Sequence, residues 1–79
     1  MKLTILSLKG VQFDGEAAGF NVKTSSGEIT VLDHHRPLVS VLTRGEAKII
    51  KTDGGRENIA INSGFLEMGP KNDLSVLID

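Results

Sequence analysis

The sequence predicts an all-β protein, a small antiparallel sandwich or flattened barrel of about eight to ten short strands. Three observations support this prediction. Short stretches rich in Leu, Ile and Val recur along the 79 residues, and turn residues separate them at close intervals. No long stretch repeats apolar residues at the helical spacing of i, i+3 and i+4. Nine glycines interrupt the chain, which disfavours helices further. The length indicates one domain, residues 1–79.

The first half of the chain contains four expected strands. Residues 3–8 carry apolar side chains on both faces, which predicts a strand with more apolar surface than one core needs. Residues 19–24 and 28–32 alternate between apolar and polar side chains, as a half-buried strand does. Residues 38–42 are nearly all apolar, which predicts a strand that is covered on both sides.

The second half predicts two hairpins. Residues 46–51 and 56–62 flank the sequence Thr-Asp-Gly-Gly at 52–55. Aspartate and glycine tolerate the positive φ that a tight hairpin turn needs, so this is the strongest turn signal in the chain. Residues 65–68 and 74–79 flank a second turn of Gly, Pro, Lys, Asn and Asp.

The composition excludes several classes of protein. The chain has no cysteine, which excludes disulfides and thiolate metal sites. A net charge of −1 and only three aromatic residues, Phe13, Phe20 and Phe65, argue against a nucleic-acid partner. The apolar runs are far shorter than a membrane span, so we expect no direct membrane insertion.

The adjacent histidines His34 and His35 are the most conspicuous candidates for chemistry. Without cysteine, a zinc site here would need Asp33 or Glu28 as a further ligand. Neighbouring residues of an extended chain point to opposite sides, which disfavours a shared ion. Pro37 indicates a surface crossing between two strands. We therefore favour a loop that contacts a partner over an idle solvated loop, and both over a metal site.

No other motif predicts catalysis. None of the serines lies in a G-x-S-x-G nucleophile elbow, and a chain of 79 residues leaves little room for a deep pocket. The glycine-containing turns lack the lysine and the following helix of a phosphate-binding loop. The sequence therefore predicts a protein that is not an enzyme and that needs no cofactor.

Four stretches of the chain carry a family pattern in order and with nearly preserved spacing. They are LTILSLKGVQFDGE, with a phenylalanine, a turn and a glycine at Phe13–Gly15, then SSGEITVLDHHRPLVSVLTRG, NSGFLEMGPKN and LSVLID. Together they resemble the N-terminal β-sandwich domain of the epsilon subunit of the rotary, proton-translocating ATP synthase. The resemblance departs from the family at Asp33-His34, where the family has Pro-Gly. The residues that match the family pattern are Gly27, Glu28, His35, Pro37, Leu38, Gly45, Gly64, Leu66, Glu67 and Pro70.

The resemblance implies a non-catalytic subunit of the central stalk, or rotor. Such a subunit joins the γ subunit to the c-ring and supports the coupling of proton flow to ATP synthesis. It implies a peripheral location on the cytoplasmic face of a bacterial-type energy-coupling membrane. Family members usually continue into a C-terminal helical hairpin, so we expect this chain to lack hairpin-based inhibition and nucleotide binding. The partner contacts implied are Ser7, Gly27, Glu28, His35, Pro37, Leu38 and Ser40.

The residues themselves support an interface independently of the resemblance. Surplus apolar side chains in strands 3–8 and 38–42 are what a stable protein–protein contact uses. The competing explanation is that these strands curl at a corner and bury both faces internally. Two alternative functions stay open at this point: a small β-sandwich module that binds an unrelated protein, and a metal-binding protein centred on the two histidines.

Overall fold

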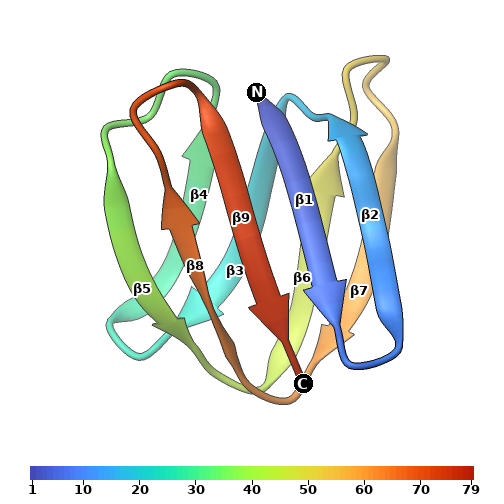
Figure 1. Cartoon of the computed structure of the whole chain (residues 1–79), viewed down its shortest axis with the longest axis vertical. Helices are drawn as coiled ribbons and strands as arrows, with labels where there is room; N and C mark the ends of the chain where they lie inside the picture. The colour runs from blue at the N-terminus through green and yellow to red at the C-terminus, as the bar shows by residue number, and fades with distance from the viewer.

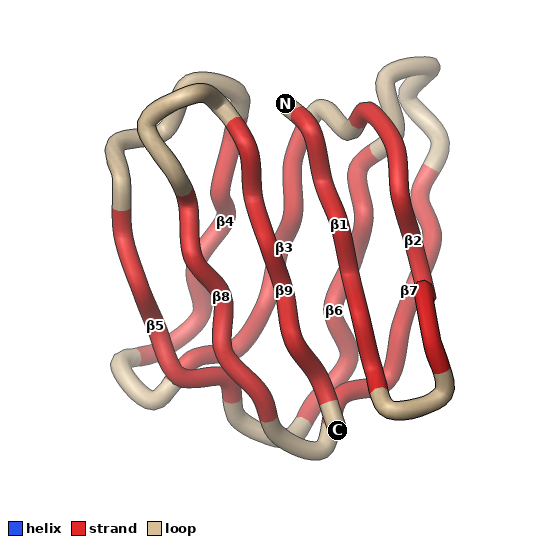
Figure 2. Tube along the Cα trace, viewed as in Figure 1, coloured by secondary structure: helices blue, strands red, loops and turns tan.

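The computed structural model describes residues 1–79 and contains nine strands and no helix (Figure 2). This confirms the predicted all-β class and the expected number of strands. The chain contains no helix that is long and apolar enough to cross a membrane. The strands are β1 (Lys2–Ser7), β2 (Gly10–Glu16), β3 (Gly19–Thr24), β4 (Gly27–Leu32), β5 (Leu38–Leu42), β6 (Gly45–Ile50), β7 (Arg56–Ile61), β8 (Gly64–Met68) and β9 (Asp73–Ile78).

The strands form two layers that face each other (Figure 1). We call β2-β1-β9-β8-β5 the front sheet and β4-β3-β6-β7 the back sheet. A single residue pair, Thr24 with Leu42, joins the two sheets at the corner between β3 and β5. Met1 lies at one end of the sandwich and Asp79 at the other, and we name the two ends after these residues (Figure 1).

One strand pairing departs from the expected antiparallel arrangement. The first strand, β1, runs parallel to the last strand, β9, while all other neighbours are antiparallel. Leu3 pairs with Leu74 and Ile5 with Val76, so the parallel ladder brings four apolar side chains into the core together. A sequence pattern of period two fixes the face of each side chain but not the direction of the neighbouring strand.

The turns agree with the sequence in the second half and differ near the start. The two predicted hairpins are confirmed, with Gly54 at φ +90° in the first and Asn72 at φ +62° in the second. The expected turn at Phe13–Gly15 was wrong, because those residues belong to β2. The chain turns earlier, before Gly10, whose φ of +114° is open to glycine at little cost.

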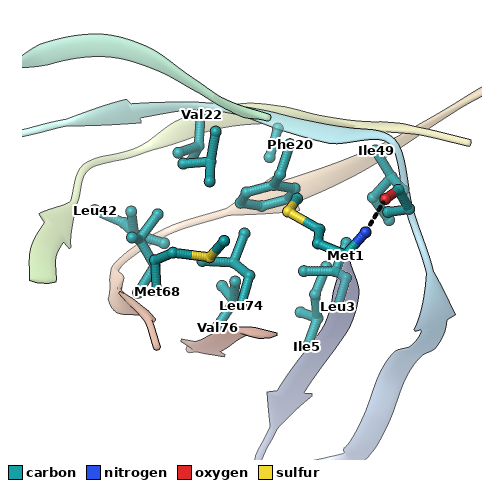
Figure 3. Packing of buried hydrophobic residues seen from close by; sticks show 14 of the residues in the cluster. Met1, Leu3, Ile5, Phe20, Val22, Leu42, Ile49, Met68, Leu74 and Val76 are labelled. Carbon is teal, nitrogen blue, oxygen red and sulfur yellow. Dashed lines mark hydrogen bonds between the residues drawn. The ribbon is translucent and has the colours of Figure 1, made fainter. Parts of the chain in front are cut away.

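The core lies between the two sheets and contains fifteen buried apolar residues. Each sheet contributes alternate side chains, and Phe20 of the back sheet packs toward Met1, Leu74 and Met68 (Figure 3). The core residues are Met1, Leu3, Ile5, Ala17, Phe20, Val22, Val31, Leu42, Ala47, Ile49, Ile61, Leu66, Met68, Leu74 and Val76.

Candidate interaction surface

A row of apolar side chains crosses the outer face of the front sheet. The strand register pairs Leu6 with Val11 and with Leu77, Leu77 with Phe65, and Phe65 with Val41. These five side chains therefore stand side by side on five neighbouring strands, and we call them the outer row. Their exposed fractions run from 37% for Leu6 to 63% for Val11.

The outer row is too continuous to be scattered surface hydrophobicity. Five strands at a spacing of about 4.8 Å give the row a length of roughly 19 Å. Val39 and Leu8 extend the apolar surface, and Leu8 is 99% exposed at the turn between β1 and β2. Monomeric proteins rarely expose contiguous apolar surface of this kind, so the outer face of the front sheet is the candidate interaction surface.

The sequence encodes the outer row through adjacent apolar pairs. Four of its members follow or precede a core residue directly: Ile5-Leu6, Val41-Leu42, Phe65-Leu66 and Val76-Leu77. Neighbours on a strand point to opposite faces, so one member of each pair must lie outside. The predicted surplus of apolar residues is confirmed. None of the five is among the contacts that the resemblance implies, although this pairing signal could have found four of them.

Strand β5 corrects the expectation that residues 38–42 are covered on both sides. Leu38 and Ser40 lie on its inner side with Leu42, and Leu38 packs against the core. Val39 and Val41 point outward and are exposed, so β5 is covered on one side rather than on both as expected. The side-chain period of a strand is two, and a shift of one residue exchanges the two faces.

Ser7 ends β1 next to the outer row. Its hydroxyl oxygen accepts hydrogen bonds from the backbone N–H of Lys9 (3.1 Å) and from the side-chain amide of Gln12 (2.9 Å). The pairing of β1 with β2 shifts its register just before Leu6, and the extra residue on β2 is Gln12. Ser7 therefore fixes the hairpin that presents Leu6, Leu8 and Val11.

Gly27 and Glu28 lie at the Asp79 end of the back sheet, where β3 turns into β4 (Figure 1). Gly27 has φ +115°, and its carbonyl accepts a hydrogen bond from the hydroxyl of Thr24 (2.7 Å). The carboxylate of Glu28 accepts one from the side-chain amide of Asn21 (3.1 Å). These two hydrogen bonds stabilise the turn, and the side chain of Glu28 remains exposed.

The two histidines lie at the opposite end, in the loop between β4 and β5. The structure does not bring His35 to Ser7 or to Glu28, because the length of the sandwich separates them (Figure 1). His35 and Pro37 are exposed, and the Nδ1 of His35 lies 2.8 Å from the carbonyl oxygen of Arg36. No group of three or more His, Cys, Asp or Glu side chains comes together in a way that could hold a metal ion.

His34 occupies a backbone conformation that suits glycine, with φ +61°. Its N–H donates a hydrogen bond to the side-chain oxygen of Asn72 (2.6 Å), which itself has positive φ. This hydrogen bond therefore holds together the two residues of positive φ at the Met1 end. His34 thus adopts a backbone conformation that usually takes glycine, and the loop compensates through Asn72.

Asp33 is the centre of a polar cluster at the Met1 end. Its Oδ1 accepts hydrogen bonds from the Met1 ammonium (2.7 Å) and from the side-chain amide of Asn72 (2.8 Å). The ammonium also donates to the carbonyl of Ala17 (2.9 Å), a bond drawn as a dashed line from Met1 in Figure 3. The hydrogen bond from the ammonium, with that from Asn72, lowers the pKa of Asp33 below 3.8. The bond to Asp33 raises the pKa of the ammonium above 8.0, against the opposing effect of burial.

The outer face of the back sheet is polar where the front face is apolar. The strand register aligns Thr30, Asn21, Lys48 and Asn58 across its four strands, and we call these residues the polar row. Asn21 donates a hydrogen bond to the Thr30 hydroxyl (2.9 Å), and Asn58 donates one to Glu46 (3.1 Å). The polar groups of this face are satisfied within the chain or open to water.

The comparisons with known proteins all indicate the same family. The model of the ATP synthase delta/epsilon chain, β-sandwich domain, matches residues 1–79. The chain is 36% identical over 70 residues to the ATP synthase epsilon chain of Bordetella petrii, covering 89% of this chain and 50% of that one. It is 35% identical over 79 residues to the epsilon chain of Shouchella clausii, covering all of this chain and 58% of that one. The chain thus spans between half and three fifths of the length of these relatives.

Solved structures agree on the fold. The chain superimposes with a TM-score of 0.90 at 22% identity on a chain of the mitochondrial ATP synthase of Euglena gracilis, solved as OSCP, F1 and c-ring; the match covers 96% of this chain and 48% of that one. A chain from the central stalk and c-ring of the Tetrahymena thermophila mitochondrial ATP synthase gives a TM-score of 0.84 at 13% identity, covering 99% and 62%. At these identities the likeness supports the β-sandwich fold.

Proposed function

Because the chain belongs to the family of ATP synthase delta/epsilon-chain β-sandwich domains, we propose that it is a non-catalytic part of the rotor. In this role it joins the γ subunit to the c-ring, so that rotation of the ring reaches the catalytic head through a stiff joint. The joint needs a rigid body with adhesive surfaces, and a sandwich with a closely packed core is rigid. Family membership argues against a sandwich unrelated to ATP synthase.

The outer row is the observation that carries this proposal. We assign the outer face of the front sheet to the γ subunit, because a rotor joint must stay closed under load and a continuous apolar surface gives the most area for that purpose. Leu77 lies at the centre of the row, between Leu6 and Phe65. The back sheet offers only a small apolar patch, Leu32 and Ile50 on either side of Gly19, and its outer face otherwise carries the polar row.

The remaining predicted contacts divide between the two ends of the sandwich. Gly27 and Glu28 at the Asp79 end suit polar loops of the c-ring, because Glu28 is an exposed carboxylate on a rigid turn. Ser7 supports the edge of the γ surface beside Leu6. His35 and Pro37 lie at the Met1 end and are proposed as peripheral contacts of γ. The inward Leu38 and Ser40 support this surface through Val39 and Val41.

The location follows from the same proposal. A chain that joins γ to the c-ring lies on the cytoplasmic face of a bacterial-type energy-coupling membrane and is held there by its partners.

Isothermal titration calorimetry of the chain with purified γ subunit tests the assignment. We expect a Kd below about 1 μM for the unchanged chain. Leu77→Asp places a carboxylate at the centre of the outer row and should weaken binding at least about 100-fold. Lys48→Asp makes a change of similar kind in the polar row and should leave Kd unchanged. Absence of binding by the unchanged chain, or equal losses in both variants, would overturn the proposal.

The c-ring contact is tested separately from the γ contact. Glu28→Gln should leave the Kd for γ unchanged, since Glu28 lies on the back sheet. The same substitution should reduce retention of the γ-bound chain on c-rings in a co-sedimentation assay. If Glu28→Gln is retained as well as the unchanged chain, Glu28 is not a c-ring contact.

A further inference from the structure

The two sheets differ in charge as well as in polarity. The strands of the front sheet carry one basic residue, Lys2, against four carboxylates: Asp14, Glu16, Glu67 and Asp73. The strands of the back sheet carry three basic and three acidic residues, and are therefore balanced. The charged side chains on the front strands are thus mostly carboxylates, while Lys9 and Lys71 lie in the two hairpin turns of the same sheet.

Two of the four front carboxylates already have a partner within the chain. Asp14 lies 3.0 Å from the Lys2 ammonium, and Glu16 lies 3.4 Å from the Met1 ammonium. Asp73 and Glu67 form no ion pair and no side-chain hydrogen bond. Asp73 is the first residue of β9, at the Met1 end of the sheet, whereas Glu67 lies beside the outer row.

Glu67 lies directly beside the outer row. It is the second of the two outward positions of β8, two residues after Phe65 of the outer row. Its cross-strand neighbours are Val39 on β5 and Ser75 on β9. Diagonal neighbours on one face of a sheet lie about 7 Å apart, which brings Val41 and Leu77 within reach of the same side chain.

A carboxylate in this position has a strong effect on which partner can bind. A partner that covers the outer row also removes water from Glu67, and burial of an unpaired charge is strongly unfavourable. A partner that places a basic side chain over the carboxylate avoids this cost and gains a charge-assisted hydrogen bond. The apolar row therefore favours association in general, whereas Glu67 discriminates between partners.

We propose that Glu67 is the specificity-determining residue of the front surface and that the partner surface covering it carries a basic side chain. This inference rests on the proposed function, in which γ is that partner. Glu46, an outward carboxylate on β6 of the back sheet, provides the matched control.

Calorimetric titration of γ into two matched variants tests the inference. Glu67→Gln removes the charge from the front surface and should raise Kd at least about tenfold at low salt, with a smaller loss at high salt, because screening weakens the pair in the unchanged chain. Glu46→Gln removes one charge from the back face, keeps the hydrogen bond with Asn58, and should leave Kd unchanged. Equal melting temperatures of the two variants confirm that both remain folded.

The outcomes separate this inference from the proposed function. If Glu67→Gln binds as tightly as the unchanged chain, or more tightly, no basic side chain meets Glu67 and the inference is wrong, while γ binding itself stands. A loss of the same size in Glu46→Gln also contradicts it, because the effect would then reflect net charge alone. If the unchanged chain does not bind γ, the proposed function fails and this inference fails with it.

Discussion

The two outer faces of this sandwich share one core and differ in almost every other respect. The front sheet aligns five apolar side chains in the outer row, whereas the back sheet aligns Thr30, Asn21, Lys48 and Asn58 in the polar row. Folding requires apolar residues only on the inner faces. The difference therefore separates what the chain needs in order to fold from what it carries for a partner.

Two glycines provide the strongest test of the difference in packing between the sheets. A Cβ added at Gly64 in β8 would collide with the carbonyl oxygen of Leu77, whereas a Cβ at Gly27 would meet nothing within 4 Å. We expect Gly64→Ala to lower the free energy of unfolding by about 3 kcal/mol or more. Gly27→Ala should cost about 1 kcal/mol from its positive φ alone. Urea denaturation measures both, and equal losses would contradict the close approach of β8 and β9.

Neighbouring residues of β9 test the claim that the outer row does not serve folding. Val76 is fully buried and Leu77 is 42% exposed. Val76→Thr places a hydroxyl in the core and should cost about 1–3 kcal/mol of unfolding free energy. Leu77→Thr should change it by less than about 0.5 kcal/mol. A large loss in Leu77→Thr would show that the front face stabilises the isolated chain.

The polar cluster at the Met1 end ties the front sheet to the loop that follows the back sheet, and it predicts a pH dependence. The pKa of Asp33 is lowered, so its contribution is present above pH 3.8 and is lost as the pH falls through the lower value of the folded state. The pKa of the ammonium is raised, so its contribution is present below pH 8.0 and is lost as the pH rises through the higher folded value.

Thermal melting of Asp33→Asn measures this contribution in the 79-residue chain. The variant should melt at a lower temperature than the unchanged chain between about pH 4 and 8. The difference should shrink in stronger acid and in stronger base. Asp14→Asn, which removes an exposed ion pair with Lys2, serves as the control and should have little effect. A difference that is independent of pH would contradict the role of Asp33.

The smallest expected effect on the free energy of unfolding concerns His34 and Asn72, the two residues other than glycine that have positive φ. His34→Gly removes the strain of a side chain at φ +61° and should stabilise the chain by roughly 0.5 kcal/mol, since the unfolded chain gains freedom that offsets part of the relief. Asn72→Gly removes the same kind of strain but also the side-chain hydrogen bonds to His34 and Asp33. It should therefore destabilise the chain, and denaturation curves that rank the two variants in the opposite order would contradict the stabilising role of these hydrogen bonds.

The sequence predicts the inner faces of this protein better than its outer ones. Alternation identifies Phe20 and Val22 as one face of a strand, and Asp53-Gly54 identifies a hairpin, because both signals are local. The parallel pairing of β1 with β9 joins residues more than 70 positions apart and has no local signature. The outward position of Val41 required the register of β5, which a single apolar run does not fix.

The candidate surface could be predicted in kind but not in place. Adjacent apolar pairs such as Val76-Leu77 show that some apolar side chains must lie outside. Only the strand order shows that Leu6, Leu77 and Phe65 meet in one row, since they come from strands that are distant in the sequence. Glu67 matched the family pattern as a residue, and its place beside the outer row became evident from the structure.

Cysteine protection tests the central claim, that the front face binds γ, most directly. The chain has no cysteine, so Leu77→Cys and Lys48→Cys each introduce one reactive thiol, on the front and the back face respectively. With γ in excess of Kd, we predict that alkylation of the cysteine at position 77 slows by at least about tenfold, because mass action leaves few open sites. Alkylation at position 48 should proceed at the same rate with and without γ. Protection at position 48 with none at position 77 would contradict the account.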